Sequence, residues 1–549
     1  MPDRPADIVF TGGHVHTVDA DRPRAEAVAV TGERISAVGS AADVAPGIGP
    51  RTRVIDLGGR LLLPGFQDAH VHPLSGGMDR TQCDLREAEG KPAVLETIRA
   101  YGEAHPDDEW IVGSGWYMGD FPGGTPRRDD LDAILPGRPA FFPNRDGHST
   151  WVSSRALELA GIGRDTPDPA DGRIERDPDG SPTGTLHEGA ADLVERLLPV
   201  PGPDAWLNAF QIGQAYLHSL GITAWQDAIV TPEDHAVYRR AAESGLLTAR
   251  VEAALWWDRT RGADQVEEMV ERSATGSSGR LRANSVKIML DGVLETFTGA
   301  VLDPYLDRDG RLTANRGIDF VDPEALREHT ARLDAAGLQV HFHAIGDRAV
   351  RSALDAIEAA RRANGPTDTR PHISHIQLIH PDDVPRFGRL DAVANAQPLW
   401  ACHETNMDEL TIPFIGEERG RWQYPFGSLL RSGARLAMGS DWPVTTPNPL
   451  LEMEVAVNRV IPTARGITPA FLPAERLTLE EAIRAFTLGS AYVNHLETET
   501  GTIEAGKLAD LTVIDRDLFA TDAGPIGDGL VLATFVGGEA VHEAPALGG

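Results

Sequence analysis

Residues 65–73 read Gly-Phe-Gln-Asp-Ala-His-Val-His-Pro, a short apolar stretch that carries two histidines two positions apart. On a β-strand, residues i and i+2 point to the same face, so His70 and His72 can present both imidazoles to one ion. Seven more segments resemble buried strands, and several follow a helical pattern that ends at a glycine. They are GITAWQDA, LTARVEAAL, SVKIMLDG, LQVHFHAIGD, PHISHIQ, AVANAQP and RLAMGSD. Eight strands that alternate with helices favour an α/β fold, a (β/α)8 TIM-like barrel, with a doubly wound open sheet as the alternative.

The two ends of the chain share a different pattern, in which short alternating strands are broken by glycine turns. We predict that residues 1–64 and 499–549 pair into one small β domain that is discontinuous in sequence. The barrel is expected over residues 65–498. A segment rich in Pro and Gly at about residues 79–198 interrupts the alternation of strand and helix, and we interpret it as an insertion that would roof the active site.

Composition excludes several kinds of partner. The 549 residues include 82 acidic and 51 basic residues, for a formal net charge of −31, and this field repels nucleic acid and anionic membranes. Only two cysteines are present, Cys83 and Cys402, which fits a reducing compartment, although two cysteines allow one bridge. A signal-peptide pattern is absent, and no stretch approaches the roughly 18 apolar residues of a membrane span, so we expect a soluble cytoplasmic protein.

Lysine is scarce, and one lysine occupies an unusual place. Of the 51 basic residues, only Lys91, Lys287 and Lys507 are lysines. Lys287 lies inside the apolar run SVKIML, where burial would shift the amine toward its neutral, nucleophilic form. The residue alone leaves three interpretations open: a carbamate formed with carbon dioxide that bridges two divalent cations, a Schiff-base lysine, and a salt bridge with Asp291 or Glu295.

Further candidate metal ligands stand at the ends of other predicted strands. His341 and His343 share one face of a strand, and geometry alone does not choose between them. His372 and His375 flank the next strand, and Asp441 ends the last one. A single histidine is more often an ordinary core or surface residue, but histidines gathered at several strand ends favour a metal centre.

These motifs together resemble a known family. GFQDAHVH, Lys287 followed by Asp291, His343 in HAIGDRAV, His375 in SHIQLIHPDD and Asp441 in GSDWPV are similar to the metal-dependent amidohydrolase superfamily. More narrowly, the chain resembles the YtcJ-like branch, which includes N-substituted formamide deformylases. The segments GHSTWVSSRAL, GSPTGTLHEGA, DGVLETFTGAVLDPY and TGTIEAGKLADLTVID extend the resemblance over essentially the whole chain. It implies a TIM-like barrel with a small β-sandwich domain formed from both termini, and it makes a homodimer plausible.

The resemblance also implies a ligand set and a reaction. It implies two Zn²⁺ ions bridged by carboxylated Lys287, which would activate water for attack on a non-peptide amide, N-substituted formamides being the leading class. Asp441 would act as general base and then as general acid. Ser374 stands where the family often has an acidic residue. The implied metal ligands are His70, His72, Lys287, His343, His375 and Asp441.

The sequence is also compatible with functions other than amide hydrolysis. The same fold would also serve an ester hydrolase, a deaminase, or an isomerase or decarboxylase, because fold does not fix function. A metal-free scaffold subunit is the alternative from a different class. Retention of a buried lysine in a lysine-poor chain argues against a scaffold.

Tryptophans indicate the character of the substrate pocket. Trp225, Trp400 and Trp442 are expected at the mouth of the barrel, and an aromatic pocket would suit an apolar or aryl N-substituent of a small-molecule substrate. The alternative is that these tryptophans pack loops against the barrel. Weaker candidates are His372 and His403 for the pocket wall, and Arg348 and Arg421 for a substrate carboxylate.

Overall fold

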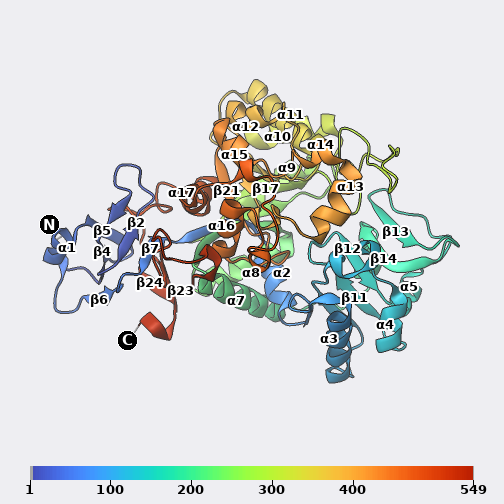
Figure 1. The fold of residues 1–549 in the computed structure, drawn as a ribbon, viewed down its shortest axis with the longest axis horizontal. Coiled ribbons are helices and arrows are strands. Elements are labelled where there is room, and N and C mark those ends of the chain that lie inside the picture. Colours follow the sequence, from blue (N-terminus) through green and yellow to red (C-terminus); the bar gives the residue numbers. More distant parts are fainter. Residues whose placement is uncertain (1–3, 548–549) are drawn as a thin grey trace.

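The centre of the molecule is an eight-stranded barrel, shown in Figure 1 in a computed structural model that describes residues 4–547. Neighbouring strands pair in parallel in the order β8-β15-β16-β17-β18-β19-β20-β21, and β21 also contacts β8, so the sheet is nearly closed. This order has no reversal, which excludes the doubly wound sheet and confirms the TIM-like barrel. The strands are β8 (Phe66–Val71), β15 (Ile222–Val230), β16 (Arg250–Trp256), β17 (Leu281–Met289), β18 (Gln339–Ala344), β19 (His372–His375), β20 (Val393–Ala396) and β21 (Leu436–Met438).

Helices cover the outside of the barrel because each has one apolar face. In α11 (Asp347–Asn364), the buried residues Val350, Ala353 and Ile357 recur at helical spacing and belong to the same core as the outward-facing side chains of the strands. The other main helices between strands are α7 (Pro203–Ser219), α8 (Pro232–Glu243), α9 (Val266–Gly276), α10 (Pro323–Ala335), α12 (Val384–Leu390), α15 (Phe426–Arg431), α16 (Pro449–Asn458) and α17 (Leu479–Arg484).

Two sheets beside the barrel form the small β-sandwich. Phe10 of one sheet and Phe535 of the other share a core, with ring centroids 5.2 Å apart. The four-stranded sheet has the order β5-β4-β1-β6, and the six-stranded sheet has the order β24-β23-β22-β7-β2-β3. The strands are β1 (Ile8–Thr11), β2 (His14–His16), β3 (Arg24–Ala25), β4 (Ala27–Thr31), β5 (Arg34–Gly39), β6 (Arg53–Asp56), β7 (Leu61–Pro64), β22 (Leu511–Ile514), β23 (Val531–Val536) and β24 (Glu539–Glu543).

The sandwich therefore combines strands from both ends of the chain, and the predicted fold class is confirmed. The domain boundaries at residues 64 and 499 stay predictions. Residues 1–3 and 548–549 of the predicted β domain lie outside the described residues.

A third unit stands between β8 and β15 in the sequence and to one side of the barrel in Figure 1. Its six-stranded sheet has the order β13-β14-β12-β11-β10-β9, and it has hydrophobic cores of its own. It occupies the segment interpreted as an insertion, whose limits of about 79–198 stay a prediction. Its elements are β9 (Cys83–Asp84), α3 (Gly90–Ala104), β10 (Ile111–Ser114), α4 (Arg128–Ile134), β11 (Ala140–Pro143), β12 (Ser149–Val152), α5 (Ser154–Ala160), β13 (Gly172–Arg176) and β14 (Pro182–Glu188).

Two features bear on the surroundings of the protein. Cys83 and Cys402 are buried free thiols, so the one disulfide that the sequence allowed is not formed. Over residues 4–547, none of the helices combines the length and the apolar character that a membrane span requires.

Candidate metal centre

The carboxyl ends of the barrel strands converge on one cavity of about 880 Å³. β8 supplies one histidine and the residue after it a second, β17 and β18 supply a lysine and a histidine, and the end of β19 and the loop after β21 complete the group. All six predicted ligands line this cavity, as expected for a barrel whose functional groups project from the strand ends. They are His70, His72, Lys287, His343, His375 and Asp441.

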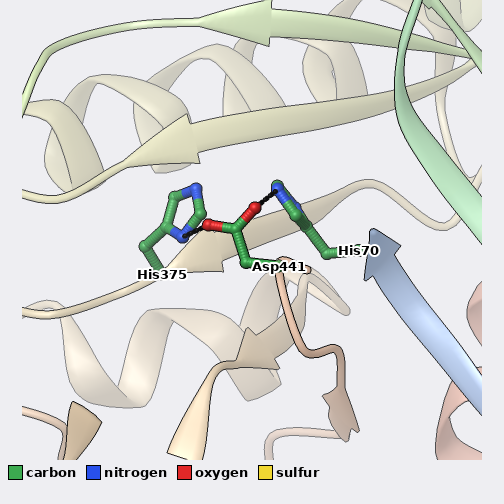
Figure 2. A group of neighbouring side chains, drawn as sticks. All are labelled: His70, His375 and Asp441. Atoms are coloured by element: carbon green, nitrogen blue, oxygen red, sulfur yellow. Dashed lines mark ion pairs between the residues drawn. The ribbon is translucent and has the colours of Figure 1, made fainter. Parts of the chain in front are cut away.

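Asp441 lies at the middle of the group, and Figure 2 shows its carboxylate between His70 and His375. Its Oδ1 atom is 2.9 Å from His72 Nε2 and 3.2 Å from His70 Nε2, and its Oδ2 atom is 3.8 Å from His375 Nδ1. Ligand atoms of His70, His375 and Asp441 lie within 4.8 Å of one another. Burial by itself raises the pKa of Asp441, but the three neighbouring histidines outweigh burial and hold this pKa well below its usual range.

Burial keeps His70, His343 and His375 neutral. Desolvation, helped by the charge of Lys287, lowers the pKa of His70 to about 3, and desolvation also holds the pKa values of His343 and His375 well below their usual range. Both ring nitrogens of His375, and Nδ1 of His72 and of His343, are buried without a hydrogen bond. Neutral imidazoles with free lone pairs around an ionised carboxylate are a donor set that fits a divalent metal.

Lys287 is buried in the barrel, and within residues 4–547 its amine forms neither a salt bridge nor a hydrogen bond. Burial lowers the pKa of Lys287 to about 8. The salt bridge that the sequence allowed is not formed. Asp291 instead accepts backbone N–H groups and lies 3.3 Å from His343 Nδ1, and Glu295 accepts a hydrogen bond from Thr411. The carbamate and the Schiff base remain as interpretations of this amine.

The structure separates the two histidines of β18, which the sequence could not. His343 lines the cavity, whereas His341 lies deeper in the barrel, with its Nε2 atom 2.8 Å from both His70 Nδ1 and Ser374 Oγ. Ser374 Oγ is also 2.9 Å from His70 Nδ1. These contacts engage Nδ1 of His70 and leave its Nε2 atom for the site. Ser374, which departs from the family pattern, therefore supports His70 and not its neighbour His375.

The backbone is left-handed at several residues that line the cavity. The φ angle is +74° at His375, +57° at Asp441 and +51° at Glu188, a conformation that costs about 1–3 kcal/mol for an L-residue. Gly439 lies so close to β8 that a Cβ atom there would fall 2.5 Å from the backbone nitrogen of His70. Such strain persists only where the surrounding fold imposes it, and it is typical of functional sites.

Comparison with known proteins places the chain in a family. The model of the Amidohydrolase family matches residues 53–542. The chain belongs to the amidohydrolase family. It is 32% identical to the Protein LONG AFTER FAR-RED 3 of Arabidopsis thaliana over 98% of this chain and 92% of that one, and 30% identical to the N-substituted formamide deformylase of Arthrobacter pascens over 98% of each. An uncharacterized metal-dependent hydrolase from Pyrococcus furiosus has a similar structure, with a TM-score of 0.69 and 26% identity over 93% of this chain and 99% of that one.

The resemblance inferred from the motifs is thereby confirmed, and the protein is a metal-dependent hydrolase that acts on carbon–nitrogen bonds. This assignment sets aside the metal-free scaffold. The catalytic and ligand roles of the individual residues stay predictions.

The tryptophans of the amidohydrolase divide into two groups. Trp400 and Trp442 line the cavity, and the ring of Trp400 stacks on His375 with centroids 5.6 Å apart. Trp225 does not line it, contrary to our expectation. Side chains alternate along β15, so that Gln226 faces the barrel interior while Trp225 is fully buried in the outer core. Additional tryptophans that line the cavity are Trp116, Trp206 and Trp256.

Other expected pocket residues of the amidohydrolase also lie away from the cavity. His372 is inside the barrel, where its Nε2 atom is 2.8 Å from Gln226 Oε1. His403 pairs with Asp408, and Arg348 pairs with Asp319. Arg421 is exposed. The arginines that do line the cavity were not indicated by the sequence; they are Arg80, Arg86, Arg145 and Arg259.

Sequence reasoning also missed a contribution from the insertion. His148 and Glu188 line the cavity, and His148 Nδ1 is 3.0 Å from both carboxylate oxygens of Glu188. Burial by itself lowers the pKa of His148, but the carboxylates of Glu188 and Asp146 outweigh burial and raise this pKa to about 9. The segments GHSTWVSSRAL and GSPTGTLHEGA contain the two residues, but nothing in their spacing shows that they meet.

Proposed function

We propose that this amidohydrolase hydrolyses a small N-substituted amide, with N-substituted formamides as the leading class, to a carboxylic acid and an amine. The observation that carries the proposal is the ionised carboxylate of Asp441, which contacts His70 and His72 in a cavity with aromatic walls. The relative named N-substituted formamide deformylase supports the substrate class. Trp400 and Trp442 would pack against an apolar or aryl N-substituent.

The proposed cofactor is a pair of divalent metal ions, with zinc favoured by the nitrogen and oxygen donors. When bound, such ions polarise a carbonyl group and lower the pKa of water to about 7. The residues that would hold them are His70, His72, carboxylated Lys287, His343, His375 and Asp441.

Carboxylation of Lys287 follows from its burial. With a pKa of about 8, roughly a tenth of the amine is neutral at pH 7. The neutral Nζ atom forms a bond to the carbon of carbon dioxide and loses one proton to solvent, which leaves an anionic carbamate. The carbamate has two oxygen donors where the amine has none, so it suits a position among the neutral histidines.

Proton transfer is assigned to Asp441. Its carboxylate is ionised, and it accepts a proton from the attacking water and passes it to the leaving nitrogen. His72, 2.9 Å from Oδ1, orients the carboxylate. His341 and Ser374 fix the ring of His70 from below, and His70 Nε2 contacts the carboxylate of Asp441.

The setting of the reaction is part of the proposal. We propose that the amidohydrolase acts in the cytoplasm, which the two buried free thiols support. We also propose that it acts on a small molecule and binds no nucleic acid, and the net charge of −31 supports the absence of a nucleic-acid partner. Light scattering checks the homodimer that the resemblance implies.

A substrate panel tests the function. Protein expressed with added zinc and bicarbonate is assayed with N-benzylformamide, formanilide, an aryl ester and an aminopurine. We expect release of formate from the formamides at a higher kcat/KM than for any other member of the panel. Preference for the ester or the aminopurine would replace amide hydrolysis with one of the other reactions of this fold.

A further inference from the structure

A second polar group borders the predicted metal centre from the side of the insertion. His148 directly precedes β12, and Glu188 ends β14. These strands pair antiparallel with Ser149 opposite His187, so the next position of the ladder brings His148 and Glu188 together. The backbone N–H of Glu188 donates to the carbonyl oxygen of His148 at 3.1 Å. The pair is therefore built by the sheet and does not depend on a flexible loop.

The carboxylate of Glu188 is held from two sides. It accepts from His148 Nδ1, and its Oε1 atom also accepts a hydrogen bond from Thr298 Oγ1 at 2.7 Å. Gly292 makes this approach possible, because a Cβ atom there would fall 2.2 Å from Glu188 Oε1. Thr298 and Gly292 belong to the segment after β17, which carries Lys287. Glu188 is thus fixed between the insertion and the barrel.

This arrangement leaves one nitrogen of His148 for a ligand. Its Nδ1 atom is engaged by Glu188, and its Nε2 atom makes no hydrogen bond to any part of the chain between residues 4 and 547. The ring lines the cavity, and its centroid is 5.5 Å from that of His343. A buried imidazole that is oriented by a carboxylate, with its second nitrogen toward a reaction cavity, is the arrangement in which histidines contact substrates.

We propose that His148 is a further catalytic residue, whose Nε2 atom binds the amide group of the substrate at the metal centre, and that Glu188 is its positioning residue. This inference rests on the proposed function, because it requires an amide beside His343. A polar contact at the reacting group orients the scissile bond and stabilises the charge that develops on it. The insertion therefore takes part in the chemistry.

Kinetics of two substrates test the inference. N-benzylformamide and N-benzyl-N-methylformamide are compared in the parent, His148→Ala and Glu188→Gln. We expect kcat/KM to fall about 100-fold in His148→Ala, as for loss of one transition-state contact, with unchanged metal content. A fall of about tenfold is expected in Glu188→Gln, which keeps an acceptor without its charge. Equal loss with both substrates assigns the contact to the carbonyl oxygen, which accepts from Nε2–H, and supports the proposal. Loss confined to the secondary amide would require Nε2 to accept from the amide N–H, which a charged ring cannot do, and overturns it.

The matched control is His187→Ala in the same hairpin. His187 is also buried and contacts Ser149 and Glu175, but it does not line the cavity. We expect its kcat/KM to stay within about twofold of the parent, since its loss removes a contact of the same kind away from the reaction. Equal activity of His148→Ala and the parent, an equal loss in His187→Ala, or loss of metal from His148→Ala overturns the proposal.

A binding measurement separates this inference from the proposed function. If the parent hydrolyses neither formamide, the function has failed, and calorimetric titration with N-benzylurea decides the inference. Binding at least tenfold weaker in His148→Ala than in the parent supports the contact. Equal binding, or no binding by the parent, overturns it.

Discussion

The barrel and the insertion bring histidines and carboxylates to the same cavity by different routes. In the barrel, His70 and Asp441 come from neighbouring strands, β8 and β21, whose carboxyl ends meet at one rim. In the insertion, His148 and Glu188 meet because the start of β12 lies opposite the end of the antiparallel strand β14. The barrel positions follow from strand alternation and can be recognised in a sequence. The insertion positions depend on pairing between distant segments. The sequence therefore does not show that a histidine and a carboxylate meet there.

The largest expected effect is on the barrel side, at Lys287. In Lys287→Ala we expect hydrolysis to fall below detection and bound metal to drop from about two ions per chain to one or none, because the variant cannot form the proposed bridging carbamate. Elemental analysis and the formamide assay measure both. Partial recovery with acetate or propionate is expected for a carbamate and not for a Schiff base. Lys91→Ala, at a lysine paired with Asp130 on the surface, should match the parent.

The second effect concerns proton transfer by Asp441. Asp441→Asn should lower kcat about 100- to 10,000-fold while most of the metal is retained, because an amide cannot carry the proton. Asp408→Asn is the control, since Asp408 contacts His403 outside the cavity. An active Asp441→Asn variant would contradict the assigned role.

The third effect is the stability cost of a buried amine, which has no counterpart in the insertion. The pKa of Lys287 falls from 10.5 to about 8 on folding, so the unfolded chain binds more protons between these pH values. In metal-free protein, Lys287→Met should therefore be more stable than the parent by about 3 kcal/mol below pH 8. This advantage should vanish as pH rises to about 10.5. Urea unfolding at pH 7 and pH 10.5 tests it, and an advantage that grows with pH would show the opposite shift.

The fourth effect probes the support of His70 beneath the site. Ser374→Ala removes one contact of His70 Nδ1 and should weaken metal affinity about 10- to 100-fold. Ser285→Ala is a matched control, because Ser285 is also fully buried in the barrel but its hydroxyl makes no hydrogen bond. Competition with a chelator measures both variants, and equal affinities would remove Ser374 from the site.

The smallest effect lies where the insertion meets the barrel. Gly292→Ala should displace Glu188 and lower kcat about tenfold without loss of metal, since the new Cβ atom would overlap Glu188 and Thr298. Gly163→Ala in the insertion, where no atom lies within 4 Å of the new Cβ, should leave kcat unchanged. Loss of metal from Gly292→Ala would show that the insertion also supports the ligands, and the two regions would then share the work of holding the metal.

Much of the barrel site could be predicted because strand spacing and chemistry agree. His70, His72 and Asp441 stand at strand ends, and the scarcity of lysine marks Lys287. It is harder to predict which side chains of a buried strand point into the barrel. A buried strand is apolar on both faces, so the sequence does not show that Gln226 points inward, and Trp225 was misplaced for that reason.

Depth along a strand and pairing between distant segments are also invisible in the sequence. His341 and His343 share one face of β18. They differ in their depth in the barrel, because the cavity reaches His343 and not His341. The contact between His148 and Glu188 depends on the register of β12 and β14, which no local pattern specifies. These are long-range properties of the fold, whereas the motifs are local.

The place of β7 in the sandwich has a consequence for biosynthesis. β7 (Leu61–Pro64) leads directly into the strand that carries His70, and it is hydrogen-bonded on one side to β22 (Leu511–Ile514). A ribosome makes β22 only after almost the whole barrel, so β7 waits for tens of seconds with one edge unpaired. During that interval, the open edge of β7 is available for β-strand pairing with other chains. β7 is thus completed by a segment that is translated after the barrel strands that follow β7 in the sequence.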